Sequence, residues 1–349
     1  NKPEDASGKG SLNGEEEYQF SARAMVDRYQ KQHFKLSWIV PNYDVQEINE
    51  EAMASFSEYA AIHDVSAGLW SQNNTPKASP DTTFIQTDTT DPKVLKNDAL
   101  ILRNNLERKR PLIFSNTGIA GSQNRTMLAF GGIGGNWENI PTQVAGFLGA
   151  SLSGQPLVGS AVDGTAGGGN AQIAIRDFEW KAFTPILFNL DDQGKFSKTP
   201  FAYNSKMTQI NRAYLKLREQ LQTYLYTLIY RAQVGEPILR PLFLEFPHEQ
   251  VNYTPQVGHE FMLGPNLLIS PIVNGREDGN GNSRKDNLYL PNHRTMWVDL
   301  FDGKKYLGGR VYNKQSYPSW HLPVFVRGGA IFDLGERNYV LYPQGKSKM

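Results

Sequence analysis

The chain contains no cysteine and only 6 histidines among its 349 residues. The lack of cysteine excludes a disulfide framework, a thiolate nucleophile and a cysteine-ligated metal site. The histidines are scattered, with no HExxH pair or other metal-ligand spacing, so we expect neither a metal nor a cofactor. No serine stands in a GxSxG elbow, which argues against an acyl-transfer triad.

Charge of one sign and long apolar runs are also missing. The 36 Lys and Arg residues nearly balance the 35 Asp and Glu residues, which excludes a strongly basic nucleic-acid binder. No window reaches the roughly 18 uninterrupted apolar residues of a membrane span. Residues 1–20 are polar and lack the apolar core of a signal peptide. The chain is therefore expected to be cytosolic or already processed, and we favour an extracellular protein.

The residues that are present predict alternating strands and helices. Short apolar runs end at Pro, Asn or Asp and are followed by amphipathic stretches, the pattern of a parallel sheet. The expected strands are 35–40, 65–70, 83–87, 111–115, 127–130, 156–160 and 184–189, and the expected helices are 22–32, 47–62, 94–109, 137–152, 173–183 and 207–234.

The hydrophobic period changes from helical to strand-like at Gly235. Short apolar runs separated by Gly, Pro and Asn follow it, typical of an antiparallel β-sandwich. We therefore expect a polar loop or cut end over 1–20, a barrel over 21–235 and a sandwich over 236–349. Seven β/α steps are one short of a closed (β/α)8 TIM-type barrel. Because open barrel edges leave backbone groups unpaired, the incomplete barrel predicts a partner segment that supplies the first strand.

Polar and aromatic residues gather just after the predicted strands, where β/α barrels build their active sites. This mixture of carboxylates, amides and aromatics suits sugar hydroxyls and sugar faces better than phosphate or metal. The set comprises Asn42, Tyr43, Asp44, Trp70, Gln72, Asn73, Asp88, Asn116, Gly131, Gly132, Asp163, Asp191 and Asp192.

Each of these positions also has a simpler interpretation. Asp88 fits either a catalytic carboxylate or a helix cap, since turn-forming residues follow it. Asp163 fits either sugar chemistry or an ordinary VDG turn, and Trp70 fits either the core or a sugar platform. The glycine runs 131–135 and 164–169 lack a GK[ST] ending and are predicted to be tight loops rather than phosphate cradles.

Several longer motifs resemble glycoside hydrolase family 31. They occur in order from about Ala22 to Gly335, namely RPLIFSNTGIAGSQNR, LSGQPLVGSAVDG, IRDFEWKAFTP, GEPILRPLFLEFP, FMLGPNLLISPIV and LPVFVRGGAIF. Within that family, LSWIVPN (36–42) and AGLWSQNN (67–74) look most like the branch of cycloalternan-forming and cycloalternan-degrading enzymes and isomaltosyltransferases.

The resemblance implies a retaining α-glucan hydrolase or transglycosylase whose nucleophile and acid lie about 5 to 5.5 Å apart. The nucleophile motif matches Thr87 and Asp88, with Asp98 as the runner-up. Asp88 and Asp191 are expected to face one cavity with Asn42 and Trp70 on its wall. Asp44 and Asn116 complete the expected substrate-binding set.

The acid position departs from the family pattern. A Trp-x-Gly-Asp motif is expected where the chain has Phe130, Gly131, Gly132 and Ile133, and no carboxylate follows before Glu138. Ala161 replaces the substrate-binding Asp, and Asp163 stands two residues later as the candidate stand-in acid. The sequence therefore predicts impaired catalysis, and a non-catalytic carbohydrate-binding protein is the alternative.

Overall fold

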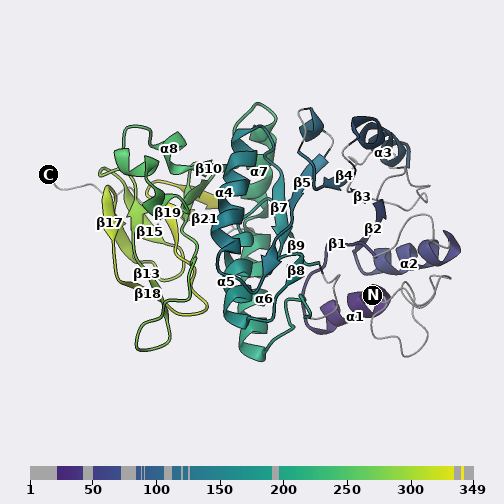
Figure 1. Ribbon diagram of the computed structural model, residues 1–349, viewed down its shortest axis with the longest axis horizontal. Helices are drawn as coiled ribbons and strands as arrows, with labels where there is room; N and C mark the ends of the chain where they lie inside the picture. The colour runs from purple at the N-terminus through teal and green to yellow at the C-terminus, as the bar shows by residue number, and fades with distance from the viewer. Residues whose placement is uncertain are drawn as a thin grey trace. The chain divides into compact units, whose positions relative to one another are not determined.

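The computed structural model describes residues 22–41, 50–71, 84–87, 89, 91–105, 112–118, 121–124, 126–190, 196–333 and 339–341. By compactness the chain divides into one unit of residues 1–129 with 191–194 and a second unit of residues 130–190 with 195–349 (Figure 1). No helix in the described ranges has the length and apolarity needed to cross a membrane.

The first unit is a run of parallel strands in chain order. Strand β1 pairs with β2, β2 with β3, β3 with β4 and β4 with β5, all parallel. Its elements are α1 (Ala22–Lys31), β1 (Trp38–Ile39), α2 (Glu50–Ile62), β2 (Ser66–Ser71), β3 (Phe84–Thr87), α3 (Pro92–Asn105), β4 (Leu112–Ser115), η2 (Ser122–Asn124) and β5 (Thr126–Phe130).

This sheet is strongly curved. The rings of Trp38 on β1 and Phe114 on β4 lie 4.8 Å apart, although two strands separate β1 from β4. Helices α1 and α2 cover β2 through a buried cluster that includes Val26, Phe56 and Leu69. Curvature with helices outside is the geometry of a β/α barrel wall.

The second unit continues the β/α pattern. Strands β7 and β9 pair in parallel, and a two-residue parallel ladder joins β6 to β8. Its barrel-type elements are β6 (Ile133–Gly134), α4 (Asn139–Leu152), β7 (Val158–Ala161), β8 (Ala166–Gly167), α5 (Ala171–Lys181), β9 (Ile186–Phe188), α6 (Ser205–Gln220) and α7 (Gln222–Ala232).

The structure differs from the sequence predictions in one helix and one strand. The single helix expected over 207–234 is two helices that meet at Leu221, where ψ is 1°. The side chain of Leu221 is buried, and the bonds from Leu221 N to Leu217 O and from Leu225 N to Leu221 O are kept across the junction. The strand expected over 35–40 pairs only at Trp38 and Ile39, because its partner β2 starts at Ser66.

The rest of the second unit is antiparallel. Six strands form a sheet in the order β10-β11-β12-β19-β15-β16, with smaller pairs β13–β18, β14–β17 and β20–β21. The elements are β10 (Leu239–Pro241), α8 (Leu242–Glu245), η3 (Gln250–Tyr253), η4 (Pro255–Val257), β11 (Phe261–Leu263), β12 (Leu267–Ile269), β13 (Ser283–Lys285), β14 (Leu288–Leu290), β15 (Met296–Asp299), β16 (Lys305–Leu307), β17 (Arg310–Tyr312), β18 (Gln315–Tyr317), β19 (Val324–Arg327), β20 (Ile331–Asp333) and β21 (Tyr339–Leu341).

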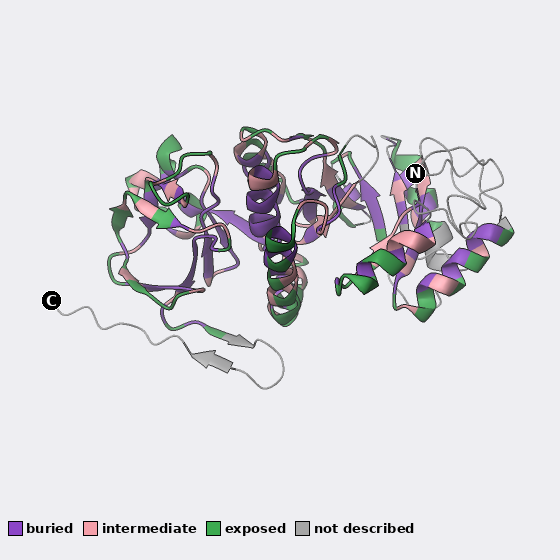
Figure 2. Ribbon diagram, turned by 90° about the horizontal axis from the view of Figure 1, so that it is seen from below, coloured by how far each residue is buried: buried purple, intermediate pink, exposed green. Residues whose placement is uncertain are grey.

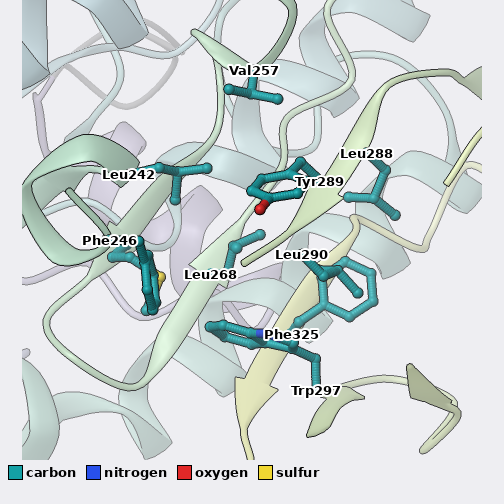
Figure 3. Close-up of a cluster of buried hydrophobic side chains, with 10 residues drawn as sticks. Leu242, Phe246, Val257, Leu268, Leu288, Tyr289, Leu290, Trp297 and Phe325 are labelled. Atoms are coloured by element: carbon teal, nitrogen blue, oxygen red, sulfur yellow. The ribbon is translucent and has the colours of Figure 1, made fainter. Parts of the chain in front are cut away.

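A hydrophobic core packs β14 against one face of the six-stranded sheet (Figure 3). Leu288 and Leu290 of β14 meet Leu268, Trp297 and Phe325 of the sheet. Strands β11 and β12 are buried along their full lengths, and Figure 2 shows buried strands in the antiparallel part of the chain. The indole of Trp297 donates a hydrogen bond of 2.8 Å to the carbonyl of Pro291, so its polar atom is satisfied. The expected antiparallel domain is confirmed.

Candidate functional site

In the second unit, backbone hydrogen bonds connect the loop that follows β5 to the loop that follows β7. Gly132 O accepts hydrogen bonds from Thr165 N at 3.0 Å and Ala166 N at 3.3 Å, and Ile133 and Gly134 pair with Ala166 and Gly167. The glycines allow this close approach, because a Cβ on Gly134 would lie 1.7 Å from the carbonyl oxygen of Asp163. The two glycine runs therefore form closely packed turns that pair through the short strands β6 and β8.

Gly132 directly precedes Ile133, which is 66% exposed and occupies the position at which the family's acid is expected. The φ of Gly132 is 155°, and a Cβ there would meet Asn139 Oδ1 at 2.3 Å and Gln143 Nε2 at 2.6 Å. Gln143 is itself fixed, since it donates to Gly131 O at 3.0 Å and accepts from Ser160 Oγ at 2.8 Å. The local packing thus leaves no ready space for a side chain at residue 132, and the exposed residue 133 is apolar.

Asp163, the predicted stand-in acid, lies at the centre of these loops in a left-handed conformation with φ of 55°. Its side chain is 3% exposed. One carboxylate oxygen accepts from Gly135 N at 2.8 Å and the other from Tyr203 Oη at 3.2 Å. Lys198 Nζ lies 3.9 Å from the carboxylate and also donates to the Asp163 carbonyl.

A second buried ion pair, between Asp177 and Lys181, contacts the backbone of Asp163. Asp177 on α5 accepts from Asp163 N at 2.7 Å and from Lys181 Nζ at 2.6 Å, and Lys181 also donates to Ala161 O at 2.7 Å. The indole of Trp180 donates to the other oxygen of Asp177 at 2.9 Å. These hydrogen bonds connect α5 to the end of β7 and to Asp163, and they hold the loop that contains Asp163 in place.

Burial is the main influence on the titration of this cluster. Desolvation raises the pKa of Asp163, and the hydrogen bond from Gly135 and the charge of Lys198 oppose that rise. Desolvation also lowers the pKa of Lys181 and raises that of Tyr203 to about 12. A carboxyl group with a raised pKa has the protonation state that a general acid needs, but the side chain of Asp163 is enclosed.

The other predicted site residues are placed as follows. Asp88, Asn42, Asp44 and Asp191 lie outside the described residues, so the predicted cavity that they share with Trp70 stays a prediction. Half-buried Trp70 stands on β2 opposite Gln86 of β3. Exposed Asn116 directly follows β4 and accepts from Thr117 Oγ1 at 3.2 Å. The runner-up Asp98 is fully buried within α3.

Sequence reasoning missed Asp177, Lys181, Lys198 and Tyr203. The spacing of Asp177 and Lys181 by four residues on a helix was the one available signal for the buried pair. Lys198 and Tyr203 follow the last β/α strand and carry no motif. Their contact with Asp163 depends on the convergence of loops 35 and 40 residues apart.

Parallel β/α elements followed by an antiparallel domain are an architecture of carbohydrate-active hydrolases. Residues 95–228 match the glycosyl hydrolases family 31 TIM-barrel domain, and residues 235–332 match the glycosyl hydrolase family 31 C-terminal domain. The chain belongs to glycosyl hydrolase family 31. The predicted fold class, an incomplete β/α barrel followed by an antiparallel domain, and the predicted family are confirmed.

Curated relatives are about 30% identical to this chain over the residues that align. Alpha-glucosidase 2 of Bacillus thermoamyloliquefaciens is 31% identical over 232 residues, which is 66% of this chain and 28% of that protein. An alpha-xylosidase of Saccharolobus solfataricus is 29% identical over 241 residues, which is 67% of this chain and 31% of that protein. The chain thus spans about 30% of the length of these two relatives.

Solved structures show the same fold at lower identity. A GH31 dextranase of Flavobacterium johnsoniae, complexed with glucose, aligns with a TM-score of 0.75 at 18% identity over 93% of this chain and 53% of its own. The cycloalternan-degrading enzyme of Trueperella pyogenes aligns with a TM-score of 0.73 at 16% identity over 88% of this chain and 60% of its own.

Proposed function

We propose that this protein acts on α-glucans by the retaining mechanism of its family, as a hydrolase or transglycosylase with impaired acid catalysis. The family membership supports the reaction class. The observation that carries the impairment is Ile133, an exposed apolar residue at the position where the family's acid is expected. The same proposal includes a barrel over 21–235 and a sandwich over 236–349. It also includes a further segment that supplies a barrel strand.

Asp88 is the proposed nucleophile, which attacks the anomeric carbon and forms a covalent glycosyl intermediate. The departing oxygen then needs a proton, and general acid catalysis contributes about 10² to 10⁴-fold. Asn42, Asp44, Trp70, Asn116 and Asp191 are proposed to hold the sugar. An extracellular location, where polymeric glucans occur, and the cycloalternan-type branch are further parts of the proposal.

Two substrate types test the missing acid. Isomaltose releases a sugar alkoxide that needs protonation, whereas α-glucosyl fluoride has a leaving group that needs little. We expect weak or undetectable hydrolysis of isomaltose and measurable turnover of the fluoride, and Asp88→Asn should abolish the latter. Similar, robust rates on both substrates would contradict the impairment.

Asp163→Asn decides whether Asp163 substitutes as the acid. An amide cannot donate a proton to the leaving group, so an acid role predicts a large loss on isomaltose and a small loss on the fluoride. Because the Asp163 carboxylate is enclosed by Gly135 and Tyr203, we expect equal proportional changes on the two substrates. A selective loss on isomaltose would assign the acid to Asp163.

A non-catalytic carbohydrate-binding protein is the second candidate. The observation that favours it is the stretch from Phe130 to Trp137, which contains no carboxylate. Saturable binding of isomaltotriose without release of glucose from any substrate, the fluoride included, would establish this candidate over the first.

A further inference from the structure

Trp320 is a partly exposed aromatic side chain that packs against two other rings. It lies in the loop between β18 and β19, and 47% of the residue is exposed. Its indole stacks on the imidazole of His321, with ring centroids 5.1 Å apart and planes 28° from parallel. The ring of Phe301, in the turn between β15 and β16, meets it edge-on at 6.4 Å and 80°.

The support behind Trp320 is itself rigid. His321 is buried, and its Nε2 lies 3.0 Å from both carboxylate oxygens of Asp299. Tyr214 of α6 donates from its hydroxyl to the Trp320 carbonyl at 3.0 Å and accepts from Leu322 N at 2.9 Å. The backbone and the ring are thus held before any ligand arrives, which lowers the entropic cost of binding.

Part of Trp320 is exposed, and charged residues follow Phe301 in the neighbouring turn between β15 and β16. Among the described residues, no acceptor bonds the indole N–H of Trp320, so that donor is available. Asp302 follows Phe301 and donates from its backbone N–H to Asp299 at 3.3 Å, which places it beside the His321 support. Its carboxylate pairs with the exposed ammonium of Lys304 at 3.0 Å.

We propose that Trp320, with Phe301 and Asp302, forms a second carbohydrate-binding site that takes an α-linked gluco-oligosaccharide outside the barrel. A pyranose ring presents C–H groups that cover an indole face, and its hydroxyls bond the carboxylate and the ammonium at the rim. One indole is far smaller than the roughly 800 Å² per partner that a protein interface needs. The ligand class rests on the proposed function, but the site is independent of the catalytic residues.

Two exposed tyrosines on α7 provide the matched control. Tyr226 and Tyr230 are 70% and 67% exposed, and no ring contact or hydrogen bond fixes either side chain in the described part of the chain. They present as much aromatic surface as Trp320 but are not preorganised. A sugar site of the kind proposed should therefore depend on Trp320 and not on Tyr226.

Native electrophoresis through gels that contain dextran tests the proposal, with Asp88→Asn present in every sample to prevent turnover. We expect dextran to retard the parent protein, Trp320→Ala to weaken retardation by about tenfold, and Tyr226→Ala to leave it unchanged. Trp320→Phe, which keeps a ring against His321, should fall between. An unretarded parent, equal retardation of parent and Trp320→Ala, or equal losses in Trp320→Ala and Tyr226→Ala would each overturn the site.

A direct measurement covers the case in which Trp320→Ala fails to fold. The indole N–H resonance of Trp320, assigned by its absence in Trp320→Phe, should shift and saturate when the protein is titrated with isomaltotriose. No shift would overturn the proposal. Turnover of α-glucosyl fluoride by the protein with Asp88 intact reports on the barrel alone. It should be equal in wild type and Trp320→Ala. The proposed catalytic function and the proposed Trp320 site can therefore fail separately.

Discussion

Asp163 Oδ1 accepts a hydrogen bond of 2.8 Å from the backbone N–H of Gly135, which lies 28 residues earlier in the chain. This bond joins the loop after β7 to the loop after β5 beside the position of the missing acid. The same carboxylate accepts from Tyr203 and lies near Lys198, so residues from three consecutive β/α loops meet on one side chain. The carboxylate therefore holds these loops together whether or not it takes part in catalysis.

Asp163→Ala should loosen these loops without unfolding the protein. Removal of the carboxylate leaves the Gly135 N–H without its acceptor, so we expect faster hydrogen exchange at Gly134 and Gly135 than in wild type. Asp163→Asn keeps one acceptor oxygen and should give a smaller effect. Glu138→Gln, a charge change on the neighbouring exposed residue, is the control. Unchanged exchange in Asp163→Ala would show that the bond does not hold the loop.

Two glycines should respond in opposite ways to alanine. In Gly134→Ala the new methyl would overlap the Asp163 carbonyl oxygen, since the Cβ lies 1.7 Å from it, and backbone cannot move aside cheaply. We expect a loss of at least about 3 kcal/mol in the free energy of unfolding. Gly149 lies in α4 with no atom within 4 Å of an added Cβ, so Gly149→Ala should stabilise by about 0.5 to 1 kcal/mol. Urea titrations that rank the two variants the other way would refute the prediction.

Sequence periodicity predicted the β/α order because each strand and helix has a local hydrophobic pattern. The predicted helix over 22–32 and strand over 127–130 agree with α1 and β5 to within one residue. The break at Leu221 was not predictable from that pattern, since it involves neither Gly nor Pro. Arg218, three residues earlier, donates to the carbonyls of Ala182 and Pro185 in the segment that follows α5, so a long-range contact lies close to the break.

The candidate site was predictable only in part. The position of Asp163 after a strand and its VDG turn are local features, and the structure places this residue among the loops at a left-handed φ of 55°. Its enclosure by Tyr203 and Lys198 is a long-range feature that no motif marks. The roles of Asp88 and Asp191 stay predictions, because both lie outside the described residues.

Arg176 should be far more important for stability than an exposed arginine. Its guanidinium is buried, pairs with Glu179 at 2.8 Å and donates to Ser283 Oγ and to the carbonyls of Tyr317, Pro318 and His321. Arg176→Met leaves Glu179 as an unpaired buried charge, which costs about 3 to 5 kcal/mol. Arg231, whose pair with Glu236 is half exposed, should lose less than about 1 kcal/mol as Arg231→Met.

The loss in Arg176→Met should depend on pH. Burial raises the pKa of Glu179 to about 7 even with Arg176 in place, and removal of the guanidinium takes away a group that opposes the rise. Glu179 is then protonated over a wider pH range in the folded variant. The stability difference from wild type should shrink as the pH falls from 8 to 5, and denaturant midpoints that differ equally at both pH values would contradict this account.

The buried carboxyl group of Asp98 should also make the stability of the protein depend on pH. It is fully buried in α3, and neither carboxylate oxygen has a hydrogen-bond partner among the residues that the structure describes. Burial raises its pKa from 3.8 to about 7. The folded protein therefore binds this proton more tightly than the unfolded chain does, which stabilises the fold fully below the unfolded pKa and progressively less as the pH rises through about 7.

Asp98→Asn removes that titration and keeps the shape of the side chain. Relative to wild type, the variant should gain stability between pH 4 and pH 7 at roughly 1.4 kcal/mol per pH unit, with no further gain above about pH 7. The comparison of melting temperatures at several pH values measures it, and Asp64→Asn, at an exposed turn, controls for the loss of one negative charge. Because other buried carboxylates titrate in both proteins, only the difference between the two curves reports on Asp98. A difference that grows as the pH falls would mean that a charged partner stabilises the Asp98 carboxylate.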